Sequence, residues 1–380
     1  MELNDRRGGN GVLPQHGGIQ FGSAHLVRDC VDDDLAGIIR LHFEIEPDEN
    51  ASSQEYELAW RWLHQGNPYS ISKILVGVDH QNKIVAHMGM FPLKFVASGK
   101  NLLAGFPEQL MVAEGFRQSL LFFNLETRFL KEYSRSGVKF IYALVTRSRV
   151  LQAHLALGFK KSGSLPVYAR PYNLSLLAEH YIPSPTLRFL VRPVLSVLES
   201  LLSLSSTPKL KRLDVVQASR FTDMWDSFLQ ESCRGFQYYA LRNADILNWR
   251  FADFPGRTYQ IYLAFENSKP AGYIVLRRMK MMGFDVLSIV DILFLPGRND
   301  VGRALLSAVH RVAVESKVDM SACLLSQHSP FLPILKRFGF IKTPQSFTLI
   351  VHKPKKGEIV MVDEKAFEQW HLTWFDNDYA

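Results

Sequence analysis

The sequence predicts two α/β domains in tandem, each built on a mixed, mostly antiparallel sheet flanked by helices. Three observations lead to this prediction: the length, an internal repeat of short sequence words, and the order of helical and strand-like segments in each repeat. A chain of 380 residues with 47% hydrophobic and 12% aromatic residues exceeds one average core and supplies enough apolar area for two.

The two halves of the chain carry similar words in the same order. Residues 59–62 (AWRW) precede a strand-like run, a turn and a second run, and residues 248–251 (NWRF) do the same in the second half. The runs are 73–78 and 83–87 in the first half, and 259–265 and 269–273 in the second, so each pair predicts a β-hairpin. Each half then closes on a Gly-Phe pair, at Gly158 and Gly339. We therefore expect Trp60 to superpose on Trp249 and Gly158 on Gly339.

Helical segments complete the order of elements. Residues 32–34 (DDD) cap a first helix whose apolar positions follow a helical period. A set of apolar residues with similar spacing predicts the corresponding first helix of the second half. Further helices are expected over 120–133 and 300–314. The apolar sets are Leu35, Ile38, Ile39 and Phe43 in the first half and Phe221, Trp225, Phe228 and Leu229 in the second. The order of elements in each half indicates a mixed sheet: a helix, antiparallel strands, a helix, a strand, a helix and a strand.

The expected organisation has five parts. Residues 1–23 are Gly-rich and polar and predict a disordered N-terminus, followed by a first domain over 24–173, a helical linker over 174–213, a second domain over 214–353 and an extension over 354–380. The most apolar stretch, 187–204, approaches spanning length, but Arg192, Pro193 and Glu199 would lie near the bilayer centre. We expect no membrane span and a linker helix that packs between or against the domains, and attachment to a membrane surface stays open.

Charge and cysteine content narrow the partners and the compartment. The formal net charge of +7 suits an anionic ligand without requiring a nucleic acid, so we expect neither a DNA nor a tRNA partner. Cys30, Cys233 and Cys323 are odd in number and lack metal-ligand spacing, which indicates a reducing compartment and no metal site. The N-terminal residues form no apolar run that could act as a secretory signal. The expected location is the cytoplasm.

This order of elements, with its Gly-Phe endings, resembles the GNAT superfamily of acyl-CoA-dependent N-acyltransferases over residues 24–171 and 214–353. The Trp-Arg words, the linker helix and residues 370–378 (WHLTWFDND) are similar to those of a bacterial subgroup of two-domain GNAT proteins. The resemblance implies an enzyme that moves an acyl group, with acetyl as the first expectation, from acyl-CoA to the amine of a small molecule or peptide.

The resemblance also implies a place for the donor. GNAT proteins carry a Gln/Arg-x-x-Gly-x-Gly/Ala turn whose backbone N–H groups receive the coenzyme A pyrophosphate at a helix N-terminus. Residues 299–304 (NDVGRA) match it in part, although the Asp300 carboxylate would repel a diphosphate. In the first half Gln118 and Leu120 should obstruct close approach, so we expect that half to be degenerate unless the turn is shifted. The implied contacts to acetyl-CoA or another acyl-CoA are Leu293, Leu295, Asn299, Val301, Gly302, Arg303 and Ala304.

Catalytic candidates follow from what amine acylation requires, a base and a proton donor. Asp291 lies in the apolar run 286–293, where burial should raise its pKa, and it could act as base or orienter or simply cap a loop. Many GNAT enzymes carry a Tyr four residues before the closing Gly, where this chain has Leu335 and His154. His328 or Ser326 would then donate the proton. In the first half, Glu108 and Gln109 occupy the position of the base.

The acceptor stays open at this point. A cleft between the domains, lined by Tyr238, Tyr239, Arg242 and Trp249, could admit an amino sugar, an amino acid or a peptide. Two other functions remain: an aminoacyl-tRNA-dependent transferase that builds peptide bridges, and a non-catalytic protein that binds acyl-CoA or another ligand with decayed GNAT domains.

Overall fold

The computed structural model describes residues 25–45, 51–70, 72–117, 119–133, 136–203, 213–353, 363 and 365–377. The predicted disordered N-terminus, residues 1–23, lies outside the described residues, as does most of the segment between residues 354 and 364.

The first half contains the predicted hairpin, helices and closing strand. Its main elements are β1 (Leu26–Asp29), α1 (Leu35–Ile45), α2 (Ser53–His64), β2 (Lys73–Val78), β3 (Ile84–Ala97), β4 (Lys100–Val112), α3 (Leu121–Tyr133), β5 (Phe140–Val145), α4 (Ser148–Ala156) and β6 (Lys160–Pro171). Local chemistry explains several boundaries. Ser52 and Glu55 form a reciprocal capping box at the start of α2. Asp34 accepts the backbone N–H of Val31 and forms an ion pair with Arg28 just before α1.

The second half repeats the order. Its main elements are β7 (Leu213–Ala218), α7 (Asp226–Cys233), β8 (Tyr238–Ala240), α8 (Ala244–Leu247), a π-helical turn (Asn248–Ala252), β9 (Gln260–Glu266), β10 (Lys269–Met281), β11 (Phe284–Phe294), α9 (Asn299–Glu315), β12 (Met320–Leu324), α10 (Leu332–Arg337) and β13 (Ile341–His352). A C-terminal segment adds the short strand β14 (Trp370–His371), which pairs with β8. Both predicted hairpins and both predicted long helices are confirmed.

The strand order confirms the internal repeat. The first half runs β1-β2-β3-β4-β5 and the second runs β7-β9-β10-β11-β12, and in each case the first three pairs are antiparallel and the last is parallel. Matching two-residue turns join the long central strands. Ser98 and Gly99 have φ of 48° and 78°, and Met282 and Gly283 have φ of 54° and 81°, as expected for turns with two left-handed residues.

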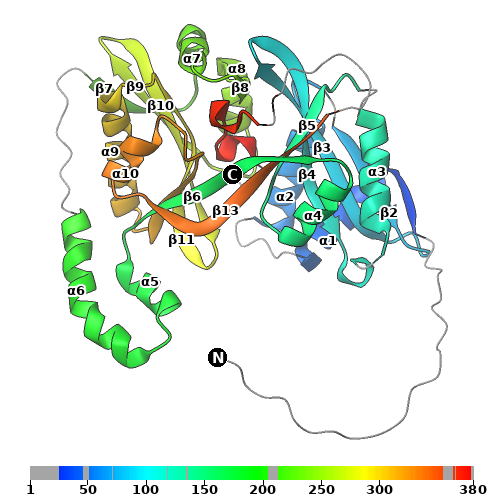
Figure 1. Cartoon of the computed structure of the whole chain (residues 1–380), viewed down its shortest axis with the longest axis horizontal. Coiled ribbons are helices and arrows are strands. Elements are labelled where there is room, and N and C mark those ends of the chain that lie inside the picture. Colours follow the sequence, from blue (N-terminus) through cyan, green and yellow to red (C-terminus); the bar gives the residue numbers. More distant parts are fainter. Residues whose placement is uncertain are drawn as a thin grey trace, which may run out of the picture.

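The two halves do not close separately. β13, from the end of the second half, lies between β5 and β6 of the first half and pairs antiparallel with both. β6 in turn pairs with β12, so the two half-sheets form one continuous sheet. Figure 1 shows β6 and β13 crossing the centre of the molecule. The sequence analysis gave each half its own closing strand, and the pairing corrects this. The predicted domain boundaries stay a prediction.

Helices α5 (Leu174–Tyr181) and α6 (Pro185–Ser203) connect the halves. The predicted linker helix is therefore confirmed, but its expected packing against the domains is wrong. α5 contacts the second half, since Leu176 and Leu177 pack against the core and His180 lies edge-on to Phe284. Figure 1 shows α6 projecting from the body, and its apolar residues are exposed, for example Phe189 at 76%. No helix among the described residues is both long enough and apolar enough to cross a membrane.

Candidate active site

Each half contains a notch where two parallel strands separate. β4 and β5 pair only at Ala104–Phe140 and Gly105–Ile141, after which β4 continues to Val112 and β5 to Val145. β11 and β12 pair over four positions, ending at Ile289–Cys323. The notch in the first half is thus longer on both strands. Separated strands no longer pair with each other, and the next helix begins near the end of the first strand.

A β-bulge lies beside each notch. The register of β3 with β4 shifts between His87 and Gly89, and Gln109 within the bulge has φ of 50°. The register of β10 with β11 shifts at Val275 and Leu276. A bulge bends the strand and redirects its side chains. Neither bulge was predicted, because the bulged residues, 108–111 in β4 and 289–291 in β11, include no Gly or Pro that would signal one.

Buried polar side chains gather at the bulge of the first half. Glu108, at the start of the bulge, is 3% exposed, and its Oε2 lies 3.9 Å from Nε2 of the fully buried His64. Nδ1 of His87, also fully buried, lies 2.9 Å from the backbone oxygen of Gln109. Burial, with a smaller effect from His87, lowers the pKa of His64 to about 3. Burial also lowers the pKa of His87 to about 4. Both imidazoles are therefore neutral at pH 7 and are poor proton acceptors there.

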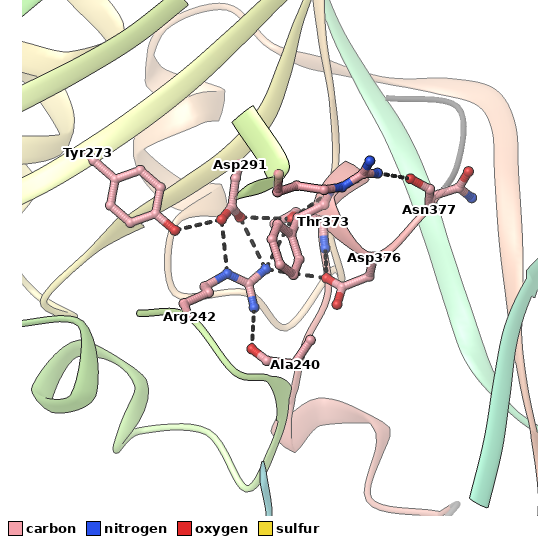
Figure 2. A network of polar contacts seen from close by, with 9 residues as sticks. Ala240, Arg242, Tyr273, Asp291, Thr373, Asp376 and Asn377 are labelled. Atoms are coloured by element: carbon pink, nitrogen blue, oxygen red, sulfur yellow. Dashed lines mark hydrogen bonds and ion pairs between the residues drawn. The ribbon is translucent and has the colours of Figure 1, made fainter. Parts of the chain in front are cut away.

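A different polar network occupies the bulge of the second half (Figure 2). Asp291 is fully buried and accepts from Arg242 at 2.9 and 3.1 Å, from the Tyr273 hydroxyl at 2.5 Å and from the Thr373 hydroxyl at 2.8 Å. Arg242 also pairs with Asp376 at 3.3 Å. The C-terminal segment thus supplies two members of the network and covers this bulge.

The predicted pKa change at Asp291 has the wrong sign. Burial alone would raise the pKa, but the charge and hydrogen bonds of Arg242, with smaller contributions from His371 and Tyr273, lower it below the usual value. An ionised carboxylate with all these partners is a poor proton acceptor. The contacts support the orienting role that the sequence analysis also allowed, and the catalytic role stays a prediction.

The expected acceptor rim is also corrected. Tyr238, Arg242 and Trp249 are 2, 2 and 8% exposed, so they belong to the core and do not line an open cleft. Tyr239, at 9%, borders a surface pocket between the halves together with Ser98 and Gln237. Trp249 stacks against Phe91 and Trp62, and its indole N–H donates to the backbone oxygen of Gly66. These contacts join the two halves.

The predicted donor residues of the second half lie in and around the first turns of α9, but the space there is largely filled. A Cβ on Gly302 would lie 2.7 Å from Cζ of Phe294, so this glycine lets α9 pack closely on β11. The Asp300 carboxylate interacts with the backbone N–H of Val301 and with Arg298, which also pairs with Glu266. Leu293 and Val301 are buried, Leu295 and Ala304 are half-buried, and Asn299 and Arg303 are exposed. The Asp300 carboxylate therefore places negative charge at the start of α9, which disfavours a diphosphate there.

His328 lies apart from the Asp291 network. It is exposed, its Nε2 is 3.2 Å from Nε2 of Gln327, and its ring packs edge-on against Phe367. Asp291 bonds to Arg242, Tyr273 and Thr373. The structure therefore gives the two predicted catalytic residues different partners.

The corresponding helix of the first half begins in a more open setting. Leu120, just before α3, is 69% exposed, and a Cβ on Gly115 would meet no atom within 4 Å. The Ser119 hydroxyl accepts the backbone N–H of Leu121. Between α3 and α4, Nδ1 of His154 lies 3.3 Å from Oε1 of Glu126, and both side chains are buried. His154, which occupies the position of the GNAT tyrosine, is therefore part of an internal polar pair.

Comparisons with known proteins add the fold family. No family model matches the chain, and no curated protein sequence does either. Among solved structures, a GCN5-related N-acetyltransferase from Anabaena variabilis superposes with a TM-score of 0.60 at 13% identity, over 87% of this chain and 73% of that chain. A tandem GNAT protein from the clavulanic acid biosynthesis pathway gives 0.59 at 12%, over 88% and 100%. Saccharomyces cerevisiae N-myristoyltransferase with bound myristoyl-CoA gives 0.60 at 12%, over 88% and 83%.

These similarities, together with the repeated strand order, show that the chain has a GNAT fold in tandem. At identities this low they establish the fold, and the chemistry must be argued from the site.

Proposed function

We propose that the protein is an acyltransferase that moves an acyl group from acyl-CoA to a primary amine. The observation that carries this proposal is the notch between β4 and β5, with a bulge and a buried carboxylate on one side and a helix N-terminus at its end. The neighbour with bound myristoyl-CoA supports an acyl-CoA donor. The acceptor and the length of the acyl chain stay open.

We place the donor in the notch of the first half, which differs from the prediction made from residues 299–304. Two features favour this choice: the longer separation of β4 from β5, and the exposed start of α3. In the second half, Phe294 packs against Gly302 and the Asp300 carboxylate holds the start of α9. The second-half residues remain the alternative donor site.

The residues of the first half supply the groups that the reaction needs. The amine nitrogen attacks the thioester carbonyl carbon, the C–S bond breaks and the thiolate takes up a proton. Glu108 is the proposed acceptor of the amine proton, and the neutral His64 lies beside it and positions its carboxylate. His154 is the proposed proton donor to the thiolate, and Glu126 orients it. Backbone N–H groups at the bulge would stabilise the oxyanion.

A matched pair of charge substitutions tests the donor site. Leu120→Glu and Asn299→Glu each place one carboxylate on an exposed residue at the start of the helix after the separated strand. Repulsion from the diphosphate should weaken acetyl-CoA binding to Leu120→Glu about tenfold or more, which corresponds to roughly 1.4 kcal/mol, and leave Asn299→Glu unchanged. Isothermal titration with acetyl-CoA and myristoyl-CoA measures both. The reverse pattern would return the donor to the second half.

Catalysis needs a separate test, because a non-catalytic acyl-CoA-binding protein is the second candidate. The observation in its favour is that neither half presents an open turn of small residues at the helix start. Thiol release from acyl-CoA, measured with a panel of primary amines, separates the two functions. We expect amine-dependent release that falls at least a hundredfold in Glu108→Gln, on the scale of a lost general base. Tight binding without release with any amine would favour the second candidate.

A further inference from the structure

Helix α6 has an apolar face that the described residues of the rest of the chain leave uncovered. Leu187, Leu190, Val194 and Val197 are spaced by three, four and three residues, so they share one side of α6. They are 48, 66, 62 and 61% exposed, respectively. Phe189, elsewhere on the helix, is 76% exposed. Figure 1 shows α6 at the outer edge of the molecule. A contiguous exposed apolar face of this kind marks an interaction surface.

Positive charge accompanies this face. Arg188 and Arg192 lie on the other side of the helix, and Arg192 is exposed. From Glu179 to Glu199 the sequence contains no acidic residue in between. Farther along the sequence, Lys209, Lys211 and Arg212 add positive charge. A helix with an apolar side and cationic side chains away from it matches an anionic bilayer, whose acyl boundary accepts the apolar residues and whose headgroups attract the guanidinium groups.

We propose that α6 docks the protein onto the surface of an anionic lipid bilayer, with Leu187, Leu190, Val194 and Val197 turned into the boundary between headgroups and acyl chains. The helix lies along the surface, in keeping with the finding that no described helix could cross a membrane. A second copy of the chain is the competing occupant. The arginines favour the bilayer, because its headgroups supply anionic partners, whereas a second copy of α6 offers no acidic residue between Glu179 and Glu199 to pair with them.

Vesicle co-sedimentation tests the proposal. The full chain is mixed with vesicles of phosphatidylcholine containing about one third phosphatidylglycerol, and with vesicles of phosphatidylcholine alone. We expect binding to the anionic vesicles that weakens as salt is added. The double variant Leu190→Asp, Val194→Asp should bind them at least about tenfold more weakly, since it removes apolar area and adds repulsion.

The control changes charge equally at a distant surface. Met224→Asp, Leu58→Asp substitutes two residues that are 50 and 45% exposed, and it should bind anionic vesicles within about twofold of the parent chain. Equal loss in both double variants would show that net charge alone drives binding, and would overturn the docking face. So would absence of binding, or a dimer in sedimentation velocity that only the α6 variant abolishes. Acetyl-CoA titration of the α6 variant, expected to match the parent, reports that it is folded.

Discussion

Arg242 is the residue on which the centre of the molecule depends. Its guanidinium is fully buried, forms ion pairs with Asp291 and Asp376, donates to the backbone oxygen of Ala240 and lies 4.5 Å from the ring centre of Phe375. Burial disfavours a charged guanidinium, but the two carboxylates outweigh it and raise its pKa. The network therefore ties β11, the segment after β8 and the C-terminal segment into one unit.

Removal of this charge should be costly. Arg242→Leu leaves Asp291 and Asp376 buried without their counter-ion, and we expect the free energy of unfolding to fall by about 3 to 5 kcal/mol. Urea denaturation measures the change. Arg220→Leu is the matched control, because Arg220 forms an exposed pair with Asp253 and should contribute less than about 1 kcal/mol. Similar losses in both variants would contradict the special position of Arg242.

Buried histidines predict how stability depends on pH. The pKa of His64 is about 3, that of His87 about 4 and that of His371 about 3, each lowered mainly by burial. Below the unfolded value of about 6.5, the unfolded chain binds protons that the folded chain does not. The free energy of unfolding should therefore fall as the pH drops from about 6.5 to 4, by roughly 1.4 kcal/mol per pH unit for each histidine.

His371→Phe provides the test. The ring of His371 stacks on Phe236 at 4.7 Å and packs edge-on against Phe331, so a phenyl ring fits the same aromatic environment. The variant should keep its stability at pH 7.5 and lose about one third of the decline between pH 6.5 and 4 in urea denaturation. An unchanged slope would show that His371 does not titrate as its burial implies.

At the scale of elements, α9 illustrates two possible uses of one glycine. Gly302 was predicted to make room for a diphosphate, whereas its Cα faces Phe294 and Ile334. Gly302→Ala should place a Cβ about 2.7 Å from the Phe294 ring and cost on the order of 1 to 3 kcal/mol through overpacking.

The control for this substitution lies before α3. Gly115→Ala adds a Cβ that meets no atom within 4 Å, so it should leave the denaturation midpoint nearly unchanged. If Gly302→Ala keeps full stability but loses acyl-CoA binding, the glycine serves the ligand and the donor site belongs to the second half.

The elements themselves could be predicted because their periodicity is local. The apolar spacing in residues 121–133 and 299–315 specifies a helix wherever those segments pack. The bulge at Gln109 and the bulge opposite Val275 and Leu276 could not be predicted, since they arise from the register between neighbouring strands. Likewise, the partners of Asp291 come from positions 49 and 82 residues away. The apolar neighbours of Asp291 in the sequence predicted a buried carboxylate. Arg242, which keeps that carboxylate ionised, reaches it only in the folded structure.

At the scale of the whole molecule, the sheet makes the halves interdependent. β13 fills the space between β5 and β6, and its strand pattern gives no hint of which half it joins. The sequence analysis therefore found the repeat and missed the exchange of closing strands. In each half the last strand of the repeat pairs with a strand from the other half: β5 with β13, and β12 with β6.

Truncation should reveal this dependence. A chain ending at residue 213 lacks β13 and β12, so it exposes the edges of β5 and β6, and we expect it to be insoluble or unfolded by circular dichroism. The control keeps all strands but is cut once, at a protease site inserted between α6 and β7. Its two fragments should elute together in gel filtration, as the parent chain does. A folded, monomeric 1–213 fragment would contradict the dependence.

The position of β13 also has a consequence for biosynthesis. β6 ends at Pro171 and β13 begins at Ile341, so the strand that lies between β5 and β6 is translated about 170 residues after they are. At bacterial or eukaryotic elongation rates of roughly 5 to 20 residues per second, that delay is on the order of ten to thirty seconds. For most of that time the nascent chain carries three unpaired strand edges, one on β5 and both on β6, which favours recruitment of chaperones at the ribosome. A ribosome that stalls before residue 341 releases a polypeptide whose first half cannot complete its sheet.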